Sequence, residues 1–331
     1  MTVKQSVEVA EAVEAAAAPT EAANVTTHCG GNVTWNEYYS DRRSTVINEF
    51  THSALLRPND SYCDVNTHAV ILVMSLHDHI AARDAIRETW GNWYANFYAH
   101  SDNKYRYIWN STYITHLVKN VKLLFVFGEH KYKTMNSQIL DESRQHGDVL
   151  QGSFREKYDH LPLKNLLAYR WITDSCRHAK YVFKIDDDFF GNIPELVNRT
   201  LLYGKDVKMV GRCNGPKKVA RRRSKNAVSC AEYPLDKYPK YLNGNPGYVI
   251  STDVIPKLYN VSRFYPFISV EDVVFTGILP NRLGISRYCD FTMRPISGSK
   301  YRMEKLDPRL KFLQSGNSEQ TRLIWKQFMT L

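Results

Sequence analysis

Acidic residues occur at two places where their types and spacing could support chemistry. Three of them, Asp186, Asp187 and Asp188, come directly after the mostly apolar run 181–185. In an extended strand, Asp186 and Asp188 would share one face, and Asp187 would point to the other. Two carboxylates on one face are hard oxygen ligands for Mn²⁺ or Mg²⁺, and such an ion can also bind a diphosphate. An acidic turn or a Ca²⁺ site is the alternative interpretation.

The second acidic pair, Glu271 and Asp272, begins a run whose apolar spacing predicts a helix over 271–283. Either acid could simply stabilise the first turn, because helix N-termini attract carboxylates. Two separate acidic sites in one chain could also have two different chemical roles. One site would hold a metal ion, and the other would take a proton from an attacking hydroxyl group.

Strands and helices alternate along the chain and would bring these acids to the edge of a sheet. Apolar and amphipathic patterns predict strands at 69–75, 121–128, 181–185 and 247–251, and helices at 81–90, 163–176, from 192, from 252 and at 271–283. This order favours an α/β fold with a mainly parallel sheet. Ligands of such sheets bind at the carboxyl ends of the strands, which is where the Asp triplet stands.

Composition predicts two regions. Residues 1–60 mix Ala, Glu and Thr without a sustained period, which is typical of a poorly ordered stem or linker, and residues 61–331 are predicted to form the catalytic domain. The Ala-rich stretch 7–19 is interrupted by Glu, and the longest apolar run, 69–76, has the length of a strand. We therefore expect a targeting segment to lie outside the given chain, unless the protein is cytosolic.

Glycosylation sequons and cysteines point to the secretory lumen. Asn-x-Ser/Thr occurs six times, at Asn24, Asn32, Asn59, Asn110, Asn198 and Asn260. The six cysteines are even in number and form no Cys-x-x-Cys pair, so disulfides are favoured over zinc. The sequence does not reveal which cysteines pair.

The formal net charge is +10, and basic residues cluster between 217 and 225. Such a cluster could bind nucleic acid, in which case binding would depend steeply on salt. A solvated loop is the favoured interpretation, because the cluster has neither helical spacing nor interleaved aromatic residues.

Several further motifs occur in a defined order along the chain. They are Arg83-Asp-Ala-Ile-Arg87-Glu-Thr-Trp90-Gly, Phe125-Val-Phe-Gly128, Lys184-Ile-Asp-Asp-Asp188, Tyr238-Pro-Lys-Tyr241, Gly247-Tyr-Val-Ile-Ser251 and Val270-Glu-Asp-Val273, with Gly277. Each block alone is weak, whereas the ordered set is specific. Over roughly residues 70–325 it resembles the β-1,3-galactosyl- and N-acetylglucosaminyltransferases of glycosyltransferase family 31.

The resemblance implies a GT-A-like fold and an inverting hexosyltransferase. The donor would be UDP-galactose or UDP-N-acetylglucosamine, the cofactor Mn²⁺, and the acceptor a glycoprotein or glycolipid glycan joined by a β-1,3 linkage. Nucleic acid is not an expected partner. The resemblance also implies a Golgi membrane protein with its catalytic domain in the lumen, held by a type II signal-anchor absent from the given chain.

The same resemblance implies roles for individual residues at the donor site. Asp188 would be the principal metal ligand and Asp186 a second carboxylate for metal and donor, with Asp187 beside the donor. Gln314 stands where many relatives have a His that completes the metal site. A neutral amide oxygen is a weaker ligand than imidazole, so we expect an unusually high metal demand.

On the acceptor side, Asp272 would be the general base, with Glu271 as the fallback. Arg83 and Arg87 would lie on the helix that borders the nucleotide, and an ion-paired helix face is their alternative role. The sequence departs from the family pattern at Ser153, in the loop 244–248 and at Gln314. These departures keep open a second function, a glycan-binding pseudoenzyme of the same fold.

Overall fold

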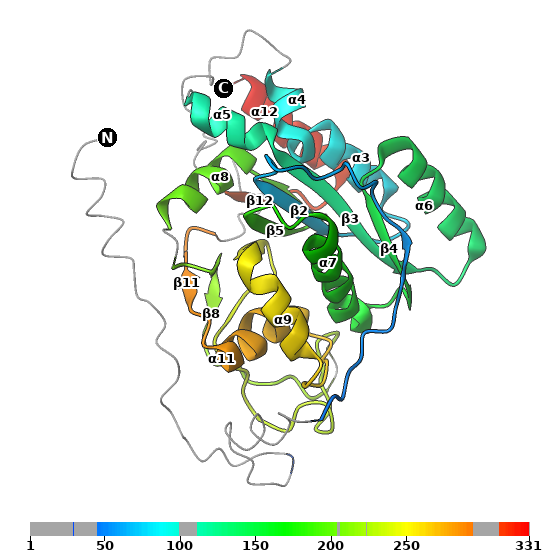
Figure 1. The fold of residues 1–331 in the computed structure, drawn as a ribbon, viewed down its shortest axis with the longest axis vertical. Coiled ribbons are helices and arrows are strands. Elements are labelled where there is room, and N and C mark those ends of the chain that lie inside the picture. The colour runs from blue at the N-terminus through cyan, green and yellow to red at the C-terminus, as the bar shows by residue number, and fades with distance from the viewer. Residues whose placement is uncertain are drawn as a thin grey trace, which may run out of the picture.

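The computed structural model describes residues 29, 45–98, 111–203, 206–222, 224–293 and 311–330. Its centre is an eight-stranded sheet in the order β1-β4-β3-β2-β5-β10-β7-β11 (Figure 1). These strands are β1 Ala54–Leu56, β2 Ala69–Met74, β3 Val121–Glu129, β4 Val149–Arg155, β5 Tyr181–Asp186, β7 Met209–Gly211, β10 Gly247–Ser251 and β11 Arg287–Cys289. Two small sheets pair β6 Phe189–Gly191 with β12 Phe312–Gln314, and β8 Cys213–Asn214 with β9 Tyr241–Leu242.

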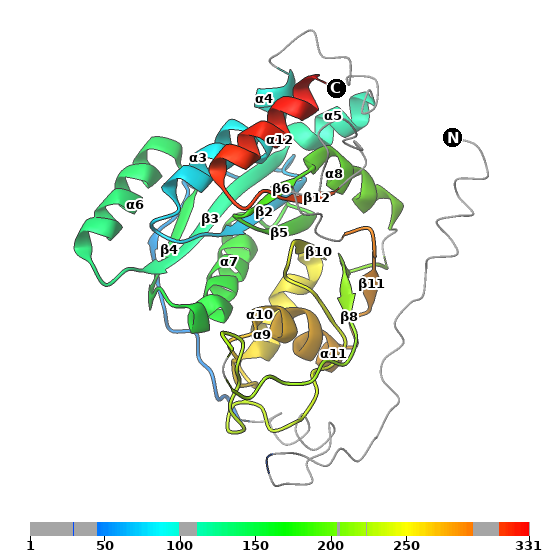
Figure 2. The same cartoon turned by 180° about the vertical axis from the view of Figure 1, so that it is seen from behind.

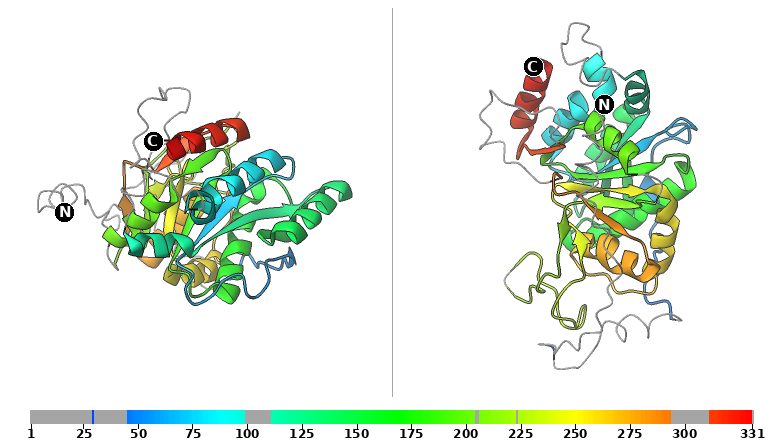
Figure 3. Two further views of the ribbon diagram at one scale, coloured as in Figure 1. Left: turned by 90° about the horizontal axis from the view of Figure 1, so that it is seen from above. Right: turned by 90° about the vertical axis from the view of Figure 1, so that its left-hand side faces the viewer.

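Helices cover both faces of the large sheet, and each face has its own hydrophobic core (Figures 1 and 2). One face packs against α7 Leu161–Ser175, α9 Ile255–Ser262, α10 Glu271–Val273 and α11 Leu279–Leu283. The other packs against α3 Ile80–Glu88, α4 Trp93–Tyr98, α5 Thr112–Lys119, α8 Ile193–Leu202 and α12 Ser318–Thr330, while α6 Lys133–His146 lies beside β4. In the right-hand view of Figure 3, α12 in red and α11 in orange lie on opposite sides of the sheet.

The predicted α/β class with a mostly parallel sheet is confirmed. Four of the seven strand pairings are parallel, namely β4-β3, β3-β2, β2-β5 and β7-β11. Strand β10 occupies the predicted residues but runs antiparallel to both of its neighbours, β5 and β7. An apolar run predicts a buried strand and carries no information on its direction.

The folded body begins before residue 61. Strand β1 pairs with β4 at the edge of the sheet, and the backbone N–H groups of Ile47 and Asn48 both donate to the carbonyl of Arg263. These contacts extend the body into residues that the sequence analysis assigned to the linker. No helix in the described part of the chain has the length and apolar character to cross a membrane.

All six cysteines form disulfides, as predicted. The pairs are Cys29–Cys230, Cys63–Cys176 and Cys213–Cys289. The first pair joins residue 29, in the predicted linker, to a long loop of the catalytic body. Because partners are separated by 76 to 201 residues in sequence, the sequence alone could not pair them.

The single helix predicted over 271–283 is wrong in detail, because a wide turn divides this stretch into two helices. The short α10 is followed by the π-helical turn η5, Val274–Ile278, and then by α11. Within that turn, the hydroxyl of Thr276 donates to the carbonyls of Asp272 and Leu242 and accepts from the Leu242 N–H. A side chain inserted into the helical hydrogen-bond ladder in this way favours such a turn, which often lies at a functional site.

Gly247 has a position that only glycine can occupy. Its φ is +154°, and a β-carbon there would lie 2.1 Å from the carbonyl oxygen of Lys184 on β5. We expect Gly247→Ala to lower the free energy of unfolding by about 2 kcal/mol or more, because strand β10 would have to move away from β5. Gly215→Ala, where a β-carbon meets no atom within 4 Å, is the matched control. Equal unfolding free energies for the two variants would contradict this close approach.

Candidate active site

The Asp triplet lies at the carboxyl end of β5, in the middle of the large sheet. Strand β5 ends at Asp186, and Asp187 and Asp188 form a turn that leads into β6. The alternation that was expected to place Asp186 and Asp188 on one face therefore stops before Asp188. Each of the three carboxylates instead has its own surroundings.

Lys184 connects the two acidic motifs. It lies on the same face of β5 as Asp186, and its side chain is 5% exposed. Its ammonium group is 2.5 Å from Oδ1 of Asp186 and 3.2 Å from Oε1 of Glu271 on α10. The triplet and the second acidic pair, separated by more than eighty residues in sequence, therefore belong to one site.

The charges of this group are strongly coupled. Burial opposes the charge of Lys184, but Asp186 and Glu271 raise its pKa well above the usual range, so the ammonium stays protonated. Burial raises the pKa of Asp186 to about 6, although Lys184 favours its charged form. Two carboxylates thus share one buried cation, which leaves the pair with excess negative charge beside Asp188.

Both oxygens of the Glu271 carboxylate are occupied by buried partners. Oε1 faces Lys184, and Oε2 accepts hydrogen bonds from Asn165 Nδ2 at 3.0 Å and from the Tyr248 hydroxyl at 3.1 Å. Glu271 itself is 6% exposed. This arrangement suits a residue that holds the site together and leaves little room for proton exchange with a substrate.

Asp272 is half-buried and has simpler contacts. Its Oδ2 accepts from the backbone N–H of Gly244 at 2.9 Å, and its Oδ1 accepts from that of Val273 at 2.8 Å. Burial and the neighbouring Glu271 charge raise its pKa to about 6, while these two N–H groups and Lys184 oppose the rise. Each oxygen keeps a free lone pair, and a carboxylate with a raised pKa is the stronger base, so the geometry favours Asp272 over Glu271 as a proton acceptor.

The raised pKa of Asp272 predicts an acidic limit to any activity that uses it as a base. Such a base works only when deprotonated, so kcat/KM should fall as the pH drops below about 6, with Asp186 titrating in the same range. The profile of kcat/KM against pH at fixed metal concentration checks this. If kcat/KM instead fell only near about pH 4, the ordinary carboxyl pKa, neither Asp272 nor Asp186 would be the group that limits activity.

Asp187 belongs to a different neighbourhood, at the end of β2. Its Oδ2 accepts from the Ser75 hydroxyl at 2.8 Å and lies 2.8 Å from Nδ1 of His79. The His79 side chain is 42% exposed, whereas Asp187 is only 12% exposed. Asp187 therefore orients a histidine at the start of α3 that can face a ligand at the carboxyl end of β2.

The two arginines are held by carboxylates within the fold. Arg83, with a fully buried side chain, binds both oxygens of Glu142 at 2.7 Å, and Arg87 binds Asp148 and Glu142 at 2.8 and 2.6 Å. Arg83 and Arg87 therefore form an ion-paired helix face, the alternative role that the sequence left open. Arg83 still reaches the site indirectly, because its Nη1 donates to the Ser75 hydroxyl that binds Asp187.

Gln314 lies on strand β12, which pairs with the strand that follows the Asp triplet. It is paired with Phe189 in the small β12-β6 sheet. The next residue, Ser315, donates its N–H and its hydroxyl to the backbone carbonyl of Asp188 at 3.0 and 3.1 Å. The C-terminal strand therefore brings Gln314 to the part of the site that contains Asp188.

Asp188 is the member of the triplet that is left for a ligand. Unlike Asp186 and Asp187, its carboxylate has no ion pair with a cationic side chain in the described parts of the chain. Burial and the Asp187 charge raise its pKa, which a bound cation would reverse. The described residues contain no group of three or more His, Cys, Asp or Glu arranged for a metal. A hard cation would fit here only with oxygens of a bound diphosphate completing its ligands.

The sequence analysis did not identify the two buried lysines that connect the site to the sheet. Besides Lys184, Lys164 on α7 is 1% exposed, binds Glu156 at 2.7 Å and donates to the carbonyl of Ser75 at 2.8 Å. A lysine within an otherwise apolar strand or helix face is the signal that could have revealed both. His79 and Tyr158 were missed because single exposed side chains leave no pattern.

Fold and site together define an α/β protein with a carboxylate site at the carboxyl end of its central strands. A family model described as Galactosyltransferase matches residues 81–290. Beta-1,3-galactosyltransferase 5 of Gorilla gorilla gorilla is 34% identical over 218 residues, which cover 65% of this chain and 66% of that protein. UDP-GalNAc:beta-1,3-N-acetylgalactosaminyltransferase 1 of Rattus norvegicus is 32% identical over 232 residues, which cover 70% and 64%.

The chain belongs to the Galactosyltransferase family, glycosyltransferase family 31. It spans just under two-thirds of the length of these two relatives. Among solved structures, a glycosyltransferase involved in the glycosylation of the major capsid of PBCV-1 is similar with a TM-score of 0.38 and 12% identity, covering 78% of this chain and 98% of that one.

Proposed function

We propose that the protein is an inverting hexosyltransferase that transfers galactose or an N-acetylhexosamine from a UDP-sugar to a glycan hydroxyl, forming a β-1,3 linkage. The observation that carries this proposal is the Lys184 ammonium between Asp186 and Glu271, which connects the Asp triplet to the acidic pair that contains the proposed base, Asp272. Membership of the family supports the reaction class, and the matched relatives are a galactosyltransferase and an N-acetylgalactosaminyltransferase.

Asp272 acts as the base in the proposed mechanism. The acceptor hydroxyl gives its proton to a carboxylate oxygen of Asp272, and the resulting oxygen nucleophile bonds to the anomeric carbon. The bond between that carbon and the phosphate oxygen breaks, and its electron pair leaves with UDP. One displacement from the face opposite UDP inverts the anomeric centre, and no covalent enzyme intermediate is required.

Asp188 and Gln314 would hold Mn²⁺ in this proposal. The Asp188 carboxylate has a raised pKa and forms no ion pair among the described residues, which suits a hard cation, and the amide oxygen of Gln314 is a weaker second donor. When bound, the ion would neutralise negative charge on the departing diphosphate. Lys184 holds Asp186 in place, and the Gly244 and Val273 N–H groups orient Asp272.

A donor screen tests the proposal. The protein with Mn²⁺ and a panel of glycan acceptors should release UDP from UDP-galactose or from a UDP-N-acetylhexosamine and give a glycosylated product. UDP-galactose is the first expectation, because the first relative named above is a galactosyltransferase. UDP-glucose serves as the comparison donor. Absence of acceptor-dependent UDP release with every donor would contradict transferase function and favour the pseudoenzyme.

We also propose that the domain acts in the Golgi lumen, as the family resemblance implies. Three disulfides are compatible with an oxidising compartment. Of the sequons in the described residues, Asn59 and Asn260 are exposed and Asn198 is half-buried.

Glycosylation gives a direct check of the compartment. Protein from its native host should migrate faster on a gel after enzymatic removal of N-glycans, because Asn59 and Asn260 are accessible to the glycosylation machinery. Asn59→Gln and Asn260→Gln should each remove part of that shift. Host protein that shows no shift would count against a lumenal location.

A further inference from the structure

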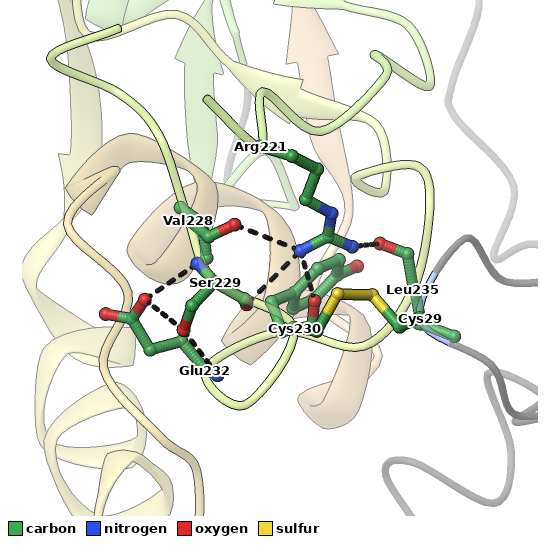
Figure 4. Close-up of a disulfide and its surroundings, with 8 residues drawn as sticks. Cys29, Arg221, Val228, Ser229, Cys230, Glu232 and Leu235 are labelled. Atoms are coloured by element: carbon green, nitrogen blue, oxygen red, sulfur yellow. Dashed lines mark hydrogen bonds between the residues drawn. A yellow bond between two sulfur atoms is a disulfide. The ribbon is translucent and has the colours of Figure 1, made fainter. Parts of the chain in front are cut away.

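The basic segment, defined here as residues 217–222 and 224–230, lies between β8 and β9 in the chain and is held in place by Arg221. The guanidinium group of Arg221 donates to backbone carbonyls spread over the turn that follows (Figure 4). These acceptors are Val228, Ser229, Tyr233 and Leu235, at 3.1, 3.2, 2.6 and 2.7 Å. The Cys29–Cys230 disulfide joins the same turn to residue 29. Both terminal nitrogens of Arg221 are thus used in shaping the segment.

The other described cations of the basic segment are not neutralised by carboxylates of the fold. Lys217, Lys218, Arg222 and Lys225 are all exposed. None of them forms an ion pair with a carboxylate in the described residues. A fixed loop that presents four unpaired cations has charge available for a ligand.

The basic segment lies against the proposed active site through Tyr158, in the turn η3, Tyr158–His160. The Tyr158 hydroxyl donates to Oδ1 of Asn226 at 2.6 Å, and the ammonium of Lys225 is 5.6 Å from the centroid of the Tyr158 ring. Burial, followed by the charges of Asp272 and Glu271, raises the pKa of Tyr158. Tyr158 therefore lies within electrostatic reach of the proposed base and joins it to the segment.

We infer that the basic segment binds an anionic group on the acceptor, so that the preferred acceptor is an acidic glycan bearing sulfate or carboxylate, with Lys225 closest to the reaction centre. This inference rests on the proposed function. Tyr158 links Lys225 to the acidic pair, and the Lys225 charge also favours the ionised form of Asp188, so Lys225 lies beside the site that acceptor and donor share. Four cations along the segment also exceed what a single donor diphosphate needs.

A matched pair of acceptors tests the inference. An aryl β-N-acetylglucosaminide and its 6-sulfate differ only in the anionic group, and both kcat/KM and binding in the presence of UDP would be measured. The wild type should prefer the sulfated member, and the preference should weaken as salt is added. Lys225→Gln should reduce the preference by about two- to fivefold, the range for an exposed ion pair.

Lys119→Gln is the control, because Lys119 is also an exposed lysine, 5.5 Å from the centroid of the Tyr94 ring, and its helix α5 packs on the opposite face of the sheet from α10. It should keep the wild-type preference. Equal preference for the two acceptors in the wild type, or an unchanged preference in Lys225→Gln, would overturn the inference.

A rise in the KM of the UDP-sugar without a change in preference would assign Lys225 to the donor diphosphate and overturn the inference as well. Transfer to neutral acceptors with no sulfate preference would leave the proposed function intact. Sulfate-dependent binding without any transfer would instead support the inference and contradict the proposed reaction, so the two failures are distinguishable.

Discussion

Replacing Asp272 by asparagine is expected to reduce hexose transfer by about a hundred- to ten-thousand-fold, the usual effect of losing a general base. The amide keeps the shape of the side chain and one oxygen acceptor for the Gly244 or Val273 N–H group, but it cannot take the acceptor's proton. Initial rates at saturating donor, together with calorimetric titration of UDP, would show lost transfer with retained UDP binding.

Asp253→Asn is a suitable control for that variant. Asp253 also stands at the start of a helical segment, but it is 56% exposed and pairs with Lys208 away from the site. It should keep wild-type activity. Wild-type turnover in Asp272→Asn would remove Asp272 from the mechanism. If Glu271→Gln then lost transfer at an unchanged melting temperature, the role of base would pass to Glu271.

Replacing Asp188 by asparagine is expected to abolish transfer at every Mn²⁺ concentration. A metal ion at a leaving diphosphate contributes several kcal/mol of charge stabilisation, so the loss should be on the order of a thousandfold or more. Asp187→Asn is the informative comparison, because Asp187 binds Ser75 and His79 rather than facing a metal. Its activity should fall less and should still respond to Mn²⁺.

Gln314→His adds a second test of the same metal site. Imidazole is a better Mn²⁺ ligand than a neutral amide, so the Mn²⁺ concentration for half-maximal activity should fall in this variant. The placement of Gln314 next to the Asp188 backbone makes this contact possible. Full activity in Asp188→Asn together with an unchanged metal response in Gln314→His would mean that the metal site is elsewhere or unused.

The order of strands and helices was largely predictable, because long apolar runs such as β2, β3 and β5 are buried in the centre of the sheet. The helix at 271–283 was predicted as continuous, because a hydrophobic period cannot reveal a wide turn created by the hydroxyl of Thr276. Strand β4 and helix α6 were not predicted. Helix α6 has only one buried residue, Ile139, so its sequence carries little helical pattern.

Both acidic motifs of the site were recognised from sequence, but their connection was not. Lys184 is hidden in a strand that reads as apolar, and its partners Asp186 and Glu271 are far apart in the chain. The prediction that Asp186 and Asp188 share one face of a strand was wrong, because the strand ends at Asp186 and a turn follows. The network around Glu271 depends on Asn165 and Tyr248 from two other elements, and such contacts arise only from tertiary packing.

The stereochemistry of the product tests the central claim most directly. The protein would be incubated with Mn²⁺, the preferred UDP-sugar, whose anomeric bond is α, and its acceptor, and the new linkage would be assigned by NMR. A single displacement with Asp272 as base predicts a β-linked product and one UDP released for each sugar transferred. An α-linked product, or sugar release without transfer to the acceptor, would contradict the account.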